Sequence, residues 1–106
     1  MQYIIEYGVR AAGLSHEQNL ANQDALLKAF GNWTGEDGLE VQAFVSKLNL
    51  TGGYILVESG GPTVVSSFVS KFLYWTDVEV VPVVEISEAV TTATASLAWT
   101  RSALSG

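Results

Sequence analysis

The sequence predicts an α+β fold: a four-stranded antiparallel sheet in the order 4-1-3-2, two helices on one face, and a third helix at the C-terminal end. Two observations predict it. Three segments alternate with the period of a strand and a fourth is almost continuously apolar, whereas three others repeat apolar residues at helical spacing. Their order is strand, helix, strand, strand, helix, strand, helix, and a hairpin between two right-handed crossovers gives this sheet. We expect residues 1–106 to form one domain.

The first strand and the first helix have clear sequence signals. Residues 2–10 alternate, and β-branched and aromatic residues dominate one face of the predicted strand. Ser15 followed by Gln18 fits a capping box, so the helix should begin directly after Ser15. It should run to about Phe30, with Gly31 ending it.

The next two strands are predicted to form a hairpin. Residues 39–48 alternate in a way that assigns Phe44 to the same face as the polar residues of that strand. Residues 51–53, Thr-Gly-Gly, supply the turn. Residues 54–59 are almost continuously apolar, which suits a central strand.

The second half of the chain adds a helix, a strand and a last helix. Pro62 suits the start of the second helix, which should end near Trp75. Residues 78–86 alternate, and Pro82 inside them indicates an edge strand. The third helix should start at Ser87. Its predicted apolar stripe consists of Val90, Ala93, Leu97 and Leu104.

Composition excludes several classes of function. Five basic and eleven acidic residues give a net charge of −6, which disfavours nonspecific binding to nucleic acid or to an anionic membrane. The absence of cysteine excludes disulfides and thiolate catalysis. We find no signal peptide and no apolar run near the roughly 20 residues that cross a bilayer, so we expect a cytoplasmic protein.

One segment resembles a known family. Residues 72–83 have the sequence Phe-Leu-Tyr-Trp-Thr-Asp-Val-Glu-Val-Val-Pro-Val. This resembles the C-terminal half of a small uncharacterised family, filed only as a domain of unknown function, whose members share a tyrosine-rich first strand, a Trp-Ser/Thr-Asp and a Val-Pro-Val. The resemblance implies a ferredoxin-like fold of the dimeric α+β barrel type. It implies no catalytic residues.

Four residues are expected to line a ligand pocket, if the fold contains one: Glu6, Trp33, Glu58 and Trp75. The two glutamates lie on the predicted central strands. A strand carboxylate covered by a partner subunit would be desolvated and its pKa raised, as in a general acid or base. The alternative is that Glu6 faces water or pairs with Arg10 or Lys47. The two tryptophans would cap the pocket, or belong to the core or an interface.

No metal or cofactor is expected. His16 is the only histidine, and at the start of a helix it should be an exposed surface residue. One histidine without cysteine leaves only carboxylates as metal ligands. The glycine clusters at residues 52–53 and 60–61 match neither a phosphate loop nor a dinucleotide-binding fingerprint.

We therefore expect a small homodimer that acts as a binding or assembly module, enclosing a small apolar ligand. The face of the sheet without helices, the open face, should carry Ile4, Phe44, Val81 and Val83, and a second copy would cover it. Alternatively, the third helix folds back over it. A different functional class also stays open: a cofactor-independent monooxygenase or isomerase in which Glu6 or Glu58 moves a proton. No catalytic residue is assigned, and whether the protein is an enzyme is undecided.

Overall fold

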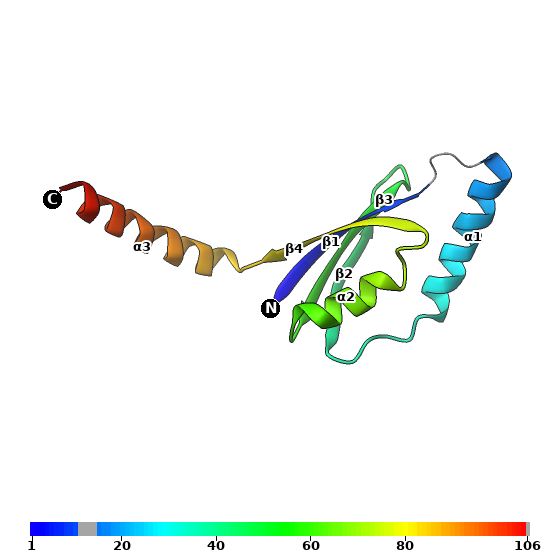
Figure 1. The fold of residues 1–106 in the computed structure, drawn as a ribbon, viewed down its shortest axis with the longest axis horizontal. Coiled ribbons are helices and arrows are strands. Elements are labelled where there is room, and N and C mark those ends of the chain that lie inside the picture. Colours follow the sequence, from blue (N-terminus) through cyan, green and yellow to red (C-terminus); the bar gives the residue numbers. More distant parts are fainter. Residues whose placement is uncertain (11–14, 106) are drawn as a thin grey trace.

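The computed structural model describes residues 1–10 and 15–105, and its elements follow the predicted order (Figure 1). They are β1 (Gln2–Val9), α1 (His16–Asn32), β2 (Leu39–Ser46), β3 (Gly52–Ser59), α2 (Pro62–Ser70), β4 (Thr76–Val83) and α3 (Ile86–Ser105). The sheet order is β2-β3-β1-β4, which is the predicted order read from the other edge. All three strand pairs are antiparallel. The α+β fold, the strand order and the additional C-terminal helix are therefore confirmed.

The core lies between the sheet and α2. Alternate residues of the central strands β1 and β3 face the helices, as their period of two requires. Phe68 of α2 is almost fully buried against them. The buried apolar residues are Tyr3, Ile5, Leu26, Ile55, Val57, Val65, Phe68 and Phe72. From β3, the cluster takes Ile55 and Val57, whereas Tyr54 and Leu56 of the same strand lie on the other face of the sheet.

Helix α1 begins as predicted and ends two residues later than predicted. The Ser15 hydroxyl accepts a hydrogen bond from the Gln18 N–H at 3.1 Å, and the Gln18 side chain accepts one from the Ser15 N–H at 2.9 Å. The expectation that Gly31 ends the helix was wrong: α1 continues to Asn32, and the extended backbone of Trp33 ends it. Leu26 is the one residue of α1 that is fully buried.

Strand β2 contains an irregularity that alternation alone did not reveal. The pairing with β3 shifts at Gln42, so the residues on either side of it oppose consecutive residues of β3. Such a bulge turns the following side chains to the other face. Phe44 therefore points to the helix side, where its ring lies 5.8 Å from Tyr7 and 5.4 Å from Phe30 between centroids. The prediction that Phe44 lies on the open face was wrong for this reason.

Gly52 and Gly53 belong to β3 and not to the turn, which spans residues 47–51. A side chain at Gly52 would collide with the backbone of Tyr7, and one at Gly53 with the Val45 carbonyl and the Tyr7 ring. Glycine is required here because the neighbouring strands approach closely.

Two other predicted boundaries also move. Helix α2 starts at Pro62 as expected but ends at Ser70, and turns lead directly into β4 at Thr76. The predicted end of α2 near Trp75 and the predicted strand over residues 78–86 were therefore both too late in the chain. Pro82 lies in β4, which pairs on one side only, so the prediction of an edge strand is confirmed.

The open face carries an apolar band between two pairs of carboxylates. Cross-strand partners share a face, and the register therefore gives the members of both groups. The apolar band consists of Ile4, Ala43, Val45, Leu56, Val81 and Val83. Glu6 pairs with Glu79 on one side of the band, and Glu40 pairs with Glu58 on the other.

Helix α3 extends away from the sheet instead of packing on it (Figure 1). None of its described side chains is buried. The molecule measures 67 × 31 × 22 Å, with a radius of gyration of 18.9 Å. A globular chain of this length has a radius of gyration of about 13 Å. The difference reflects the projecting helix.

Candidate functional site

The main candidate site is a cavity of about 630 Å³ between α1 and the helix side of the sheet. It lies where β1 and β2 end and β3 begins. Leu27 and Leu50, both mostly exposed, lie at its edge. The lining residues are Tyr7, Val9, Gln23, Leu26, Leu27, Phe30, Trp33, Phe44, Ser46, Leu50 and Gly52. Most of this surface is aliphatic or aromatic.

Local sequence explains the space. Gly52 contributes no side chain at the start of β3, and the neighbouring Gly53 leaves room for the Tyr7 ring. The bulge in β2 turns Phe44 into the lining, where it meets Tyr7 and Phe30 edge-on. Because few residues of α1 reach the sheet, the volume behind Leu26 is not filled by the chain itself.

Few polar groups line this apolar cavity. Burial raises the pKa of the Tyr7 phenol, so the hydroxyl keeps its proton well above neutral pH and can donate a hydrogen bond. Gln23 and Ser46 also contribute polar side chains to the lining. A pocket with apolar walls and few polar groups is typical of sites for small molecules.

A second, shallower hollow of about 320 Å³ lies on the other side of Trp33 and is also lined by Trp75 and Lys71. Lys71 forms an ion pair with Glu36, joining the loop before β2 to the end of α2. The hydrogen bond from Lys71 lowers the pKa of the Glu36 carboxyl, and the Ser67 hydroxyl adds a smaller effect. The Trp33 indole is close enough to contribute, although its Nε1 does not reach hydrogen-bond geometry with the carboxylate.

The two predicted strand glutamates lie on the open face, away from the cavity. Glu6 is 43% exposed, and its carboxylate is 3.5 Å from the Lys47 ammonium, so it makes one of the pairings expected as the alternative to acid–base chemistry. Arg10 pairs with Asp77 at 2.8 Å instead.

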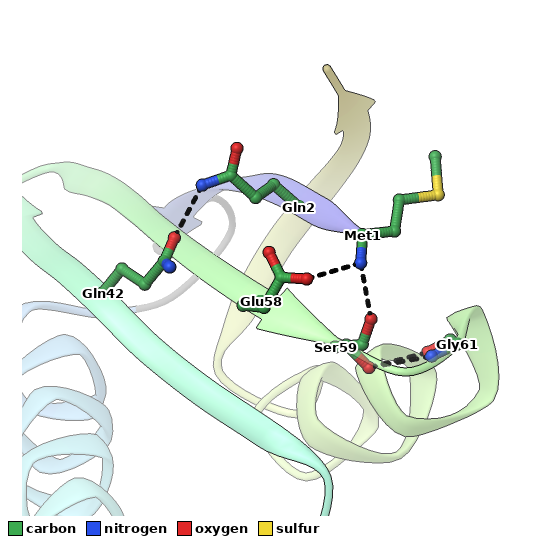
Figure 2. A network of polar contacts seen from close by, with 6 residues as sticks. All are labelled: Met1, Gln2, Gln42, Glu58, Ser59 and Gly61. Carbon is green, nitrogen blue, oxygen red and sulfur yellow. Dashed lines mark hydrogen bonds and ion pairs between the residues drawn. The ribbon is translucent and has the colours of Figure 1, made fainter. Parts of the chain in front are cut away.

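Glu58 accepts a hydrogen bond from the N-terminal ammonium of Met1 at 2.6 Å and is 42% exposed (Figure 2). Beside it, the Gln2 side-chain amide donates to Gln42 at 2.8 Å, which links β1 to the bulge (Figure 2). Glu58 also lines a shallow depression of about 420 Å³ near the start of β2.

The structure thus distributes the four predicted site residues over separate places. Trp33 lines the main cavity, Trp33 and Trp75 share the shallow hollow, and Glu6 and Glu58 lie on the opposite face of the sheet. Sequence reasoning missed Tyr7, Phe30 and Phe44 as cavity residues. The available signal was the Gly52-Gly53 pair, whose missing side chains leave space between strands rich in aromatic residues.

The described residues offer little else for chemistry. His16 is exposed in the first turn of α1. Among residues 1–10 and 15–105, no group of three or more histidine or acidic residues is placed to hold a metal ion. Within the same ranges, no helix is long and apolar enough to cross a membrane.

Comparison with known proteins supports one part of the resemblance seen in residues 72–83, namely that the chain belongs to an uncharacterised family. It does not test the ferredoxin-like superfamily that the resemblance implied. A search of curated proteins finds no match. The family model described as a domain of unknown function (DUF3303) matches residues 1–97, which include the whole sheet, α1, α2 and residues 86–97 of α3. The chain therefore belongs to the DUF3303 family.

Proposed function

We propose that this protein binds a small apolar ligand in the cavity between α1 and the sheet. The observation that carries the proposal is the cavity itself, whose volume of about 630 Å³ suits a small molecule and whose walls are mainly aliphatic and aromatic. The rings of Tyr7, Phe30 and Phe44 offer large apolar contact areas to such a ligand.

The cavity residues also limit the kind of ligand. Among the described residues, no lysine or arginine lines the cavity, and the whole chain has a net charge of −6. An anionic ligand would therefore meet no cationic partner there and an unfavourable long-range field. The protonated Tyr7 hydroxyl suits a hydrogen-bond acceptor. A neutral molecule with a ring or chain and a single carbonyl or ether oxygen fits these features best.

Binding fits the cavity residues better than proton transfer. The monooxygenase or isomerase hypothesis required a strand carboxylate inside the ligand site. Glu6 and Glu58 lie on the opposite face of the sheet, so neither contacts a ligand held in this cavity.

We also propose that the protein is a homodimer whose open face is covered in the assembly. The apolar band on that face includes Ile4 and Val81, which are 37% and 42% exposed. Monomers rarely leave a contiguous apolar patch of more than a few hundred Å² uncovered. Light scattering at micromolar concentration tests the proposal: we expect twice the chain mass, and a mass of 11.3 kDa would contradict it.

Two matched leucine variants test the ligand proposal. Leu27 and Leu20 are 69% and 55% exposed on the same helix, and only Leu27 lines the cavity. In a titration with the neutral apolar dye Nile red, Leu27→Glu should weaken binding about fivefold, because about 1 kcal/mol of apolar contact is lost. Leu20→Glu should bind like the unmodified protein. No binding of the dye, or equal effects of the two variants, would overturn the proposal.

A further inference from the structure

We propose that α3 packs against the open face of a second copy of this chain, so that two copies exchange their C-terminal helices. This inference rests on the proposed homodimer and specifies the element that forms it.

Helix α3 requires a packing partner. It is 20 residues long and none of its described side chains is buried. Its four threonines make it a weak helix former, and helices in isolation draw little stability from their own propensity. Figure 1 shows it projecting from the sheet with no other element beside it. The stability of such a helix must come from apolar contacts with another surface.

The side chains of α3 are suited to burial. Three threonine hydroxyls donate to backbone carbonyls one turn earlier in the same helix, at 2.9–3.0 Å, so burial would leave none of the three unpaired. Glu88 and Arg101 are its two charged residues, and their charges cancel. Because α3 starts at Ile86, this residue joins the predicted stripe of Val90, Ala93, Leu97 and Leu104, and the five follow one another at helical spacing.

The apolar band of the open face is shorter than this stripe. The stripe extends about 27 Å along the helix, at 1.5 Å per residue. The band crosses the four strands, which lie about 4.8 Å apart, so it is about 15 Å long and can contact the middle of the stripe. A helix lying along the band would therefore bury the central part of its stripe, and it would do so once in each of the two reciprocal contacts.

Charge favours α3 over a second open face as the cover. Glu6 and Glu79 lie on one side of the band, and Glu40 and Glu58 on the other. Lys47 pairs with Glu6 and the Met1 ammonium pairs with Glu58, so Glu40 and Glu79 are the two that have no ion pair among the described residues. Two open faces with aligned bands would place these carboxylates against one another, and like charges in contact disfavour an interface. Helix α3 brings no net charge to the same surface. A second copy must provide the helix, because each α3 points away from its own sheet (Figure 1).

Crosslinking tests which surfaces meet. The chain contains no cysteine, so single introduced cysteines give unambiguous products. An Ile4→Cys chain is mixed with a Leu97→Cys chain that carries a mass tag, and a short bis-maleimide is added. We expect a crosslink between the two different chains. Ala95→Cys, on the opposite side of α3 from Leu97, is the matched control and should crosslink to Ile4→Cys much less.

Each other outcome has a distinct meaning. Crosslinks between two Ile4→Cys chains without mixed products would show that the sheets meet directly, so the homodimer would stand and the helix exchange would be wrong. Crosslinking within one chain carrying both cysteines, together with a monomeric mass for the unmodified protein, would show that α3 covers its own sheet. That result would overturn both the exchange and the homodimer.

Discussion

The ion pair between Glu36 and Lys71 holds together two segments that are distant in the sequence. The Glu36 side chain is 11% exposed, and the Lys71 side chain is 49% exposed. Because Lys71 donates to the ionised carboxylate, the pKa of Glu36 is lower in the folded protein than its ordinary value. At a given pH, the Glu36 carboxyl is therefore protonated more readily in the unfolded chain than in the folded protein. The stability that the Glu36 carboxylate contributes is fully present above the ordinary carboxyl pKa. It is lost as the pH falls through the lower pKa that Glu36 has in the folded protein.

The lowered pKa of Glu36 predicts that the stability of the fold depends on pH. The urea concentration at half-unfolding should fall between pH 6 and pH 3.5, and Glu36→Gln should reduce that fall, because the variant has no carboxylate to protonate. Glu40→Gln is the control: Glu40 is exposed and forms no ion pair among the described residues. Identical pH profiles for the unmodified protein and Glu36→Gln would show that the pair does not stabilise the fold.

Helices and strands were predicted correctly where neighbouring residues determine them, and wrongly where contacts with distant parts of the chain do. Alternation placed Glu6 on the open face, and the apolar run of residues 54–59 identified β3 as central, because both patterns can be read within a single strand. The bulge at Gln42 depends on pairing with β3, so residues 39–48 alone gave Phe44 the wrong face. The cavity was not predicted for a related reason. It depends on the distance between α1 and the sheet, and no short sequence pattern indicates that distance.

Helix α1 shows the reverse case, in which a local signal determines the start of an element. The capping box of Ser15 and Gln18 satisfies backbone donors that have no partner inside the helix. Ser15→Ala should lower the free energy of unfolding by about 1 kcal/mol. Ser66→Ala, at an exposed position inside α2, should change it by less than about 0.5 kcal/mol. Urea unfolding followed by circular dichroism compares them, and equal losses would show that the capping box has no special role.

At the scale of the whole molecule, the sheet with α2 has a buried core, whereas α3 has no buried contacts. The sequence predicted both α3 and its apolar stripe, since helical spacing is local. It left open whether the helix returns to its own sheet. That choice depends on the direction of the chain after Val83, and the structure directs α3 away from the sheet (Figure 1). An extended monomer with an uncovered sheet face and an uncovered helix has two complementary surfaces, and assembly can bury both.

If helix exchange holds the dimer together, stability must depend on protein concentration, because unfolding then separates two chains. A tenfold increase in concentration adds about 1.4 kcal/mol per dimer. With an unfolding entropy of about 2.1 cal/mol/K per residue over both chains, the thermal midpoint should rise by about 3 °C for each tenfold increase. Leu97→Glu places a charge in the apolar stripe and should abolish this dependence, whereas Ala95→Glu, on the opposite side of α3, should retain it. Calorimetry from 1 to 100 μM measures all three proteins. A constant midpoint for the unmodified protein would mean that each chain unfolds alone, and α3 would then have no partner in solution.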